Sequence, residues 1–182
     1  MTHMLPKRSG VLQIVEFVKA VGFGMRTGHV LEWQPDRGMT PLAGTETAFP
    51  NGIALSSDGA TLFLNSSLAG KVLRIDRASG RPPGSAEVAG PDNSSWAPDG
   101  RLLVASFVGP LWETLACDGI ERGACPIAFE IIAVDPETLA TEILYRGEGA
   151  PMGAGTVGLQ VGTDLFIGSF AGDRILRVQR GR

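Results

Sequence analysis

The sequence predicts an all-β protein: a partial β-propeller of about three to four blades, each a four-stranded antiparallel sheet, with one short N-terminal helix. Three observations predict this fold. Short apolar runs recur at a spacing typical of propeller blades, about 40 to 45 residues. Turn residues separate the runs. The 182 residues include 25 Gly and 12 Pro and are only 19% charged, which favours many turns over long amphipathic helices.

The clearest repeat is carried by residues 50–59 and 91–100, which begin 41 residues apart. Each segment runs from a proline to an Asp-Gly pair and is followed by an apolar run, and a weaker copy covers residues 157–169. Asp-Gly between two apolar runs predicts a β-hairpin whose two central turn residues both have positive φ.

A second series of apolar runs begins at His29, Lys71, Ile131 and Arg174, at intervals of 42, 60 and 43 residues. The two short intervals agree with one blade each. The long interval contains an insertion at residues 108–125, between the second and third strands of its blade. Ordered insertions of this length are usually functional.

The two series together predict how the strands are shared among blades. Strands near 28–34 and 39–43 would be the last two of a first blade, two whole blades would follow, and three strands near 156–178 would begin a fourth. We expect residues 1–10 to form a tail and residues 11–182 one propeller domain. Such an array leaves sheet edges unpaired. Either the chain is a piece of a longer one, or two copies form a homodimer that completes the propeller.

Composition limits the classes of partner. The net charge of −3, without a basic stripe, argues against nucleic acid and against anionic membrane surfaces. No apolar run approaches the roughly 20 residues that a membrane helix needs. Residues 11–21 are apolar but interrupted by Gln13, Glu16 and Lys19, which predicts one amphipathic helix. The N-terminus lacks a signal-peptide pattern, and the compartment is left open.

Segments 27–33 and 49–59 resemble the middle of the strictosidine-synthase-like and gluconolactonase families, and 90–93 and 165–170 resemble their following blades. The chain is therefore identified as a member of the senescence-marker-protein, gluconolactonase, paraoxonase and strictosidine-synthase-like group, with a resemblance that covers roughly residues 11–178. This resemblance implies the C-terminal half of a six-bladed propeller.

The same resemblance implies a site. In the calcium-dependent members, a metal in the central tunnel is held by Asn, Asp and Glu from the starts of the innermost strands. Carried over to this sequence, the ligands are Asn51, Asp92 and Asn93, with Asp92 as the catalytic base. The cofactor implied is a divalent metal, calcium, which takes oxygen ligands from carboxylates, amides and water. The implied function is metal-assisted hydrolysis of a small-molecule lactone or related ester, incomplete without further blades.

Three alternatives stay open beside this hypothesis. Asn-Gly and Asp-Asn are also ordinary turn residues, so the chain could be a non-catalytic binding or interaction propeller. It could also be an inactive truncated fragment. A strictosidine-synthase-like condensing enzyme is disfavoured, because the place of its glutamate is taken here by residues 156–158, which include no acid. Enzymatic activity is left open, with a lactonase or esterase-type hydrolase favoured.

Two further motifs need an interpretation. Residues 153–158 spell G-x-G-x-x-G, but a strand rather than a helix is expected after them, which argues against a dinucleotide site. Cys117 and Cys125 lie inside the insertion, where they form either a small disulfide or two reduced cysteines. The insertion also carries Trp112 and Leu115 and is expected to overhang the tunnel mouth as a lid.

Overall fold

The computed structural model describes residues 1–109 and 111–179, and of Leu111 and Trp112 only the backbone. The chain divides into two compact units, Met1–Glu87 and Val88–Arg182. Each unit is described by itself.

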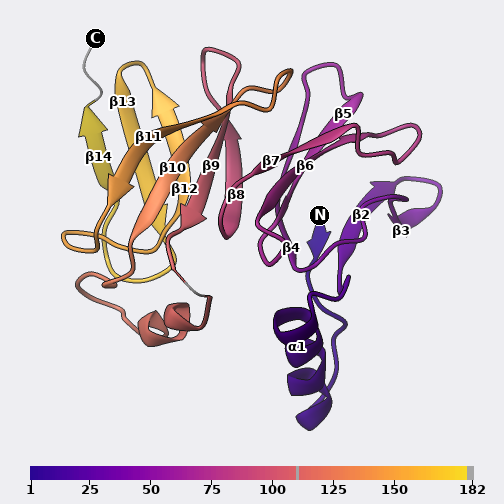
Figure 1. Ribbon diagram of the computed structural model, residues 1–182, viewed down its shortest axis with the longest axis horizontal. Helices are drawn as coiled ribbons and strands as arrows, with labels where there is room; N and C mark the ends of the chain where they lie inside the picture. The colour runs from indigo at the N-terminus through magenta and orange to yellow at the C-terminus, as the bar shows by residue number, and fades with distance from the viewer. Residues whose placement is uncertain (110, 180–182) are drawn as a thin grey trace. The chain divides into compact units, whose positions relative to one another are not determined.

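The first unit holds two antiparallel sheets, with strand orders β1-β2-β3 and β4-β5-β6-β7 (Figure 1). Its elements are β1 (Thr2–His3), α1 (Val11–Phe23), β2 (His29–Gln34), β3 (Gly38–Pro41), β4 (Pro50–Leu55), β5 (Thr61–Ser66), β6 (Lys71–Asp76) and β7 (Gly84–Glu87). Apolar side chains of both sheets form its core, with Val30, Leu62, Leu64 and Ile75 buried. The sheets therefore hide their apolar faces against each other.

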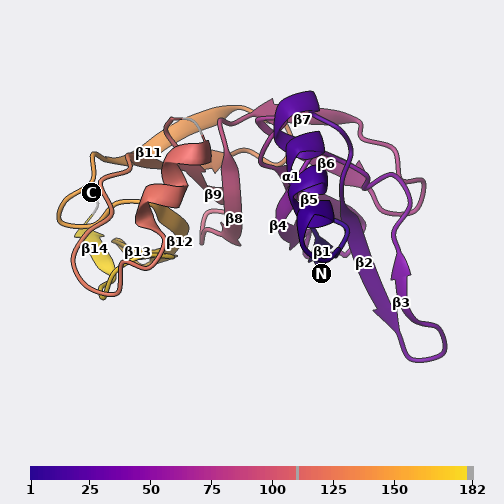
Figure 2. The ribbon, with the colours of Figure 1, turned by 90° about the horizontal axis from the view of Figure 1, so that it is seen from below.

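The second unit repeats this plan with strand orders β8-β9-β10-β11 and β12-β13-β14 (Figures 1 and 2). Its elements are β8 (Pro91–Trp96), β9 (Leu102–Phe107), the 3-10 helix η1 (Leu111–Cys117), β10 (Phe129–Val134), β11 (Thr141–Gly147), β12 (Gly155–Val161), β13 (Asp164–Ser169) and β14 (Leu176–Gln179). All six residues of β9 and of β10 are buried, as expected for strands covered on both faces.

The predicted fold class is confirmed: the protein is all-β, and its four antiparallel sheets of three or four consecutive strands have the order of propeller blades. The one expected helix is α1. The two four-stranded sheets are complete blades. Sheet β1-β2-β3 corresponds to the last three strands of a blade, because β1 flanks β2 as β5 flanks β6.

The structure differs from the expected tail at residues 1–10. Thr2 pairs with Val30 and His3 with His29, so β1 is an ordered strand. The amino group and the carbonyl of Met1 also bond to Leu31, at 2.9 and 2.7 Å. A two-residue strand has no apolar periodicity, which is why the sequence pattern did not predict it.

Both Asp-Gly hairpins form, but the expected turn type is wrong. Only the glycines have positive φ, 73° at Gly59 and 86° at Gly100, whereas the preceding aspartates do not. The N–H of Gly59 donates to the carbonyl of Ser56 at 2.9 Å, and Asp58 Oδ1 accepts from the N–H of Ala60 at 3.0 Å. The aspartate thus stabilises the turn through its carboxylate, and a left-handed glycine ends the turn.

Helix α1 ends at Gly24, whose φ of 58° and N–H bond to the Ala20 carbonyl, at 3.1 Å, are typical of a helix C-terminus. Among the described residues, no helix is both long and apolar enough to cross a membrane.

Candidate functional site

The three innermost strands, β4, β8 and β12, are entered in the same way. The residue before each strand has left-handed φ: 56° at Phe49, 46° at Gly90 and 49° at Ala154. Residues other than glycine rarely adopt this conformation, and those that do cluster at functional sites. The strained entry therefore marks one end of these strands in both units.

A β-bulge follows at once in each of the three strands. The register with the next strand shifts between Pro50 and Ile53, between Pro91 and Ser94, and between Gly155 and Val157. The second residue of each strand falls in its bulge, and these residues are Asn51, Asp92 and Thr156. The structure thus makes the two main candidates equivalent, with Thr156 as the third member. Bulges commonly re-aim a side chain next to an active site.

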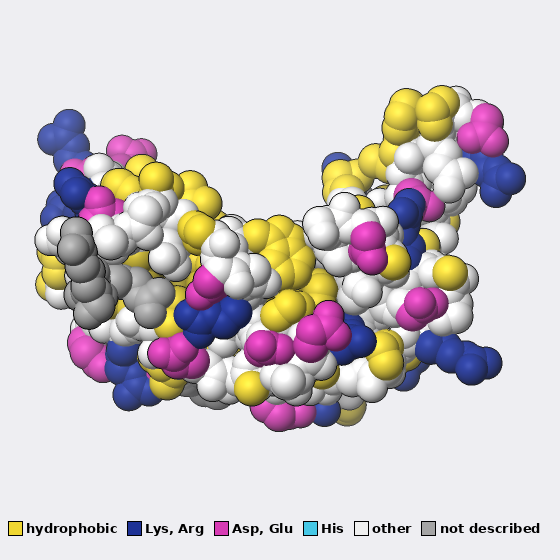
Figure 3. All heavy atoms as spheres, turned by 90° about the horizontal axis from the view of Figure 1, so that it is seen from above, with side chains coloured by type: hydrophobic (Ala, Val, Ile, Leu, Met, Phe, Trp, Pro, Cys, Tyr) yellow, Lys and Arg dark blue, Asp and Glu magenta, His cyan; other side chains and the backbone are white. Residues whose placement is uncertain are grey.

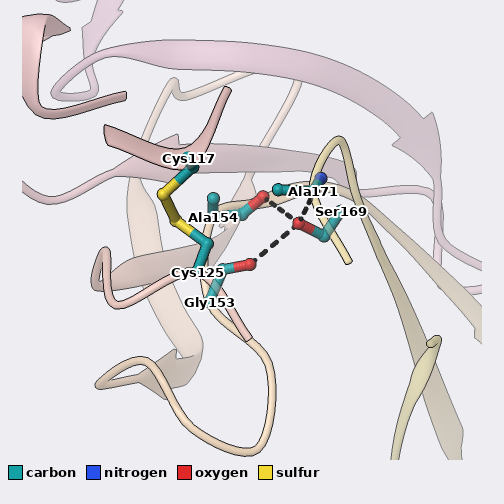
Figure 4. Close-up of a disulfide and its surroundings, with 6 residues drawn as sticks. All are labelled: Cys117, Cys125, Gly153, Ala154, Ser169 and Ala171. Carbon is teal, nitrogen blue, oxygen red and sulfur yellow. Dashed lines mark hydrogen bonds between the residues drawn. A yellow bond between two sulfur atoms is a disulfide. The ribbon is translucent and has the colours of Figure 1, made fainter. Parts of the chain in front are cut away.

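Three serines that the sequence analysis missed hold this geometry. Ser66, Ser106 and Ser169 end the second strand of their sheets, and each Oγ donates to a backbone carbonyl two residues before the inner strand. The donor–acceptor distance is 2.9 Å for both Ser66 and Ser169. Figure 4 shows Ser169 with its two carbonyl acceptors. The signal was present in the sequence, because each repeated apolar run ends in serine.

In the second unit, the structure brings Asp92 and Asn93 together with Thr156. Asp92 is buried, with 7% of its surface exposed, whereas Asn93 is exposed. The Nδ2 group of Asn93 donates to the Thr156 carbonyl at 3.0 Å, and two residues further on Ser95 Oγ donates to the Gly158 carbonyl. Strands β8 and β12 therefore lie side by side at their starts. The Asn93 bond uses the amide nitrogen and not the oxygen that a cation needs.

In the first unit, Asn51 is half-buried at the start of β4. Asn65, a further polar residue that the sequence analysis missed, lies opposite this bulge on β5 and is fully buried. Asn51 belongs to the first unit and Asp92 to the second, and the common channel expected for them stays a prediction.

The question of the two cysteines has an answer: Cys117 and Cys125 form a disulfide with a Cα–Cα distance of 5.4 Å. Both are buried and pack with Phe107, Ile127, Ala154 and Ala171. Of the side chains expected to overhang the tunnel, Leu115 is exposed, whereas those of Leu111 and Trp112 lie outside the described residues.

The insertion lies at the end of the second unit where β12 begins. The N–H of Gly172, beyond β13, donates to the Ile120 carbonyl at 2.7 Å, and the disulfide lies beside Gly153 and Ala154 (Figure 4). A side chain at Gly153 would overlap the carbonyl oxygen of Cys125. The insertion is therefore packed onto the strained entry to β12. Its role as a lid over a channel stays a prediction.

The same contacts explain the G-x-G-x-x-G motif. Strand β12, not a helix, follows its first glycine, as expected from the sequence. A Cβ atom at Gly155 would collide with the ring of Phe129, and one at Gly158 would collide with Ile131. The glycines thus permit close packing of β12 on the neighbouring sheet.

Charged groups away from these strand starts form local pairs. On the face drawn in Figure 3, acidic and basic side chains are intermingled. The Ser79 hydroxyl lowers the pKa of Asp76, and the backbone N–H of Thr138 lowers the pKa of Asp135. Both aspartates follow the third strand of a four-stranded sheet, so this turn is repeated as well. These carboxylates stabilise turns and are not site residues.

The side chains at the inner-strand starts fit calcium in kind. Within the described part of the chain, no group of three or more His, Cys, Asp or Glu could hold a metal. Asp92 offers a carboxylate, and Asn51 and Asn93 offer amide oxygens, which are the hard donors that calcium takes. A shell of six to eight ligands would need water or further groups as well.

A family model described as the SMP-30/Gluconolactonase/LRE-like region matches residues 14–122, more than half of the chain. The chain belongs to this family. The part that matches the SMP-30/gluconolactonase/LRE-like family contains Asn51, Asp92 and Asn93 and ends inside the insertion.

Comparison with solved structures gives distant likenesses. Hydrazine synthase of Kuenenia stuttgartiensis is 18% identical, with a TM-score of 0.44, over 75% of this chain and 32% of that one. A luciferin-regenerating enzyme is 16% identical, with a TM-score of 0.49, over 78% of this chain and 44% of that one. Regucalcin of Agrobacterium tumefaciens, a calcium-binding protein, is 17% identical, with a TM-score of 0.44, over 77% and 43%. This member of the SMP-30/gluconolactonase/LRE-like family spans less than half the length of each, and no curated protein matches it.

Proposed function

We propose that this chain contributes a cation-assisted hydrolytic site that acts on a lactone or related ester. Asp92 is the catalytic base, and Asn51, Asp92 and Asn93 are oxygen ligands. The observation that supports this proposal is the threefold repeat of strained entry, bulge and serine bond at the inner strands. Strained backbone of this kind costs about 1–3 kcal/mol per residue and persists where the surrounding structure enforces it.

The chemistry assigned to Asp92 is that of a general base. Its carboxylate is largely shielded from bulk water and is suited to hold a proton taken from an attacking water molecule. The water oxygen bonds to the ester carbonyl carbon, the ester C–O bond breaks, and the proton held by Asp92 passes to the departing oxygen. A lactone gives a hydroxy acid. Bound calcium would supply Lewis acidity toward the carbonyl.

Asn93 is a positioning residue as well as a ligand in this proposal. Its Nδ2 bond to the Thr156 carbonyl fixes the orientation of the amide. The bond also joins the start of β8 to the start of β12, so that Asp92 is presented from a strand held on both sides. Replacing Asn93 by Asp would lose the donor and weaken this support.

The test is hydrolysis of a panel of aliphatic and aromatic lactones by the chain with calcium. Asp92→Asn should lower kcat/KM by about a hundredfold or more, the usual contribution of a general base. Asp118→Asn, at an exposed aspartate of the insertion in the same unit, is the matched control and should leave the rate unchanged. Equal rates in wild type and Asp92→Asn would contradict the assignment. No hydrolysis of any lactone would favour a binding propeller or an inactive fragment.

A further inference from the structure

Helix α1 is placed with its polar side toward the rest of the first unit. Gln13, Glu16 and Lys19 are half-buried, and Ala20 is buried. These residues share one side of the helix, because their spacing is three or four. The remaining side chains are apolar and exposed, among them Val11 (74%), Ile14 (62%), Val18 (48%), Val21 (37%) and Phe23 (76%).

This arrangement is the reverse of an ordinary surface helix, which buries its apolar side. With 3.6 residues per turn, Val11, Ile14, Val18 and Val21 lie opposite Ala20 and form an apolar strip without a polar side chain. A contiguous exposed apolar surface of this kind marks a site of interaction.

The helix projects from a defined end of its unit (Figure 1). At its base, Thr27 Oγ1 donates to the Met4 carbonyl at 3.1 Å, and the Thr27 N–H donates to the Thr47 carbonyl at 3.1 Å. Thr47 lies just before the strained entry to β4, so the apolar strip and Asn51 belong to the same end of the first unit.

Exposed basic residues flank the helix. Lys7 and Arg8 precede it and Arg26 follows it, while Lys19 is paired with Glu16 at 3.1 Å. Residues 7–26 contain four basic and one acidic residue, a local charge of +3 in a chain whose net charge is −3. Glu46, exposed in the loop before β4, lowers this local excess by one.

We propose that α1 docks the protein on an anionic lipid surface, with the helix lying in the plane of the interface. The apolar strip suits the acyl region, and the basic residues at both helix ends suit anionic headgroups. Thirteen residues are too few to span a bilayer. The expectation of no membrane partner came from the charge of the whole chain, which conceals the local excess.

Sedimentation with vesicles tests this proposal. The chain should bind vesicles of phosphatidylcholine and phosphatidylserine in equal amounts. Replacing Ile14 and Val18 by Ser should weaken this binding about a hundredfold, since each buried aliphatic side chain contributes about tenfold. Lys7→Gln with Arg8→Gln should weaken binding to the mixed vesicles by about fivefold per residue, and not binding to pure phosphatidylcholine. Ile175→Ser is the matched control, because Ile175 is 71% exposed in the second unit, and should bind as wild type does.

A probe at the helix gives a second readout. Both native cysteines are in the disulfide, so Val18→Cys provides a unique thiol for an environment-sensitive dye. Its emission should shift to the blue on the mixed vesicles. Absence of vesicle binding, or binding that the Ile14 and Val18 substitutions do not change, would overturn the proposal. A soluble dimer that the same substitutions convert to a monomer, without vesicle binding, would overturn it in favour of contact between two copies.

Discussion

Two connections of this protein occupy the same place in their sheets and are built in opposite ways. The β1–β2 connection carries α1, and the β9–β10 connection carries η1 and the disulfide. Helix α1 buries only Ala20, whereas the second connection buries Cys117, Cys125 and Ile127. A long connection in this fold is therefore not one kind of structure. One is part of the core of its unit, and the other presents an apolar surface outward.

The largest expected difference concerns stability. Replacing Cys117 and Cys125 by Ser should lower the free energy of unfolding by about 2–3 kcal/mol, because the bridge closes a short loop in the unfolded chain. Replacing Ile14 and Val18 by Ser should change it by less than about 0.5 kcal/mol, because both side chains are exposed. Urea unfolding followed by circular dichroism measures both. Equal losses would show that α1 is as much a part of the core as the insertion.

Glycine-to-alanine substitutions sharpen the same comparison through their sign. Gly153→Ala should destabilise by about 1–3 kcal/mol, because its Cβ would meet the Cys125 carbonyl, which cannot move freely. Gly22→Ala, in open space within α1, should stabilise by up to about 1 kcal/mol through helix propensity. Thermal unfolding should shift the two midpoints in opposite directions. A stabilising Gly153→Ala would mean that the insertion does not press on the entry to β12.

A smaller effect is expected at the serine bonds. Ser106→Ala should cost about 1–2 kcal/mol, since the fully buried hydroxyl is lost and its carbonyl partner loses a donor. Ser57→Ala, at an exposed turn serine, is the matched control and should be neutral within the error of a urea melt. Ser106→Ala matters more to the account if it also lowers hydrolysis, because the bond shapes the approach to Asp92. Wild-type stability in this variant would remove the serine bond from the description of the site.

The sequence was informative where the structure repeats. The spacing of the apolar runs located most strands, and the shared register from proline to Asp-Gly placed Asn51 and Asp92 at equivalent positions. The features that were missed lack such a pattern. Positive φ at Phe49 and Ala154 leaves no trace in the residue type. The amphipathic pattern of α1 was visible, but not which side of the helix faces outward.

The smallest effect concerns pH. Hydrogen bonds lower the folded-state pKa values of Asp76 and Asp135 below the unfolded value of about 3.9. Their contribution to stability is therefore present above about pH 4 and is lost as the pH falls through the folded pKa values. Urea midpoints at descending pH should fall less steeply for Asp76→Asn and Asp135→Asn than for wild type. Asp36→Asn, at an exposed turn, should keep the wild-type slope. Parallel slopes in all variants would assign the acid sensitivity to other groups.

The central claim is that Asn51, Asp92 and Asn93 belong to one cation site at the starts of the inner strands. The most direct test is the melting temperature of the chain as a function of calcium concentration. A ligand that binds only the folded state raises it progressively above the dissociation constant. The account predicts this rise for wild type and Asp118→Asn, and its loss in Asn51→Ala and in Asp92→Asn. An unchanged melting temperature in wild type, or a rise that survives both substitutions, would contradict it.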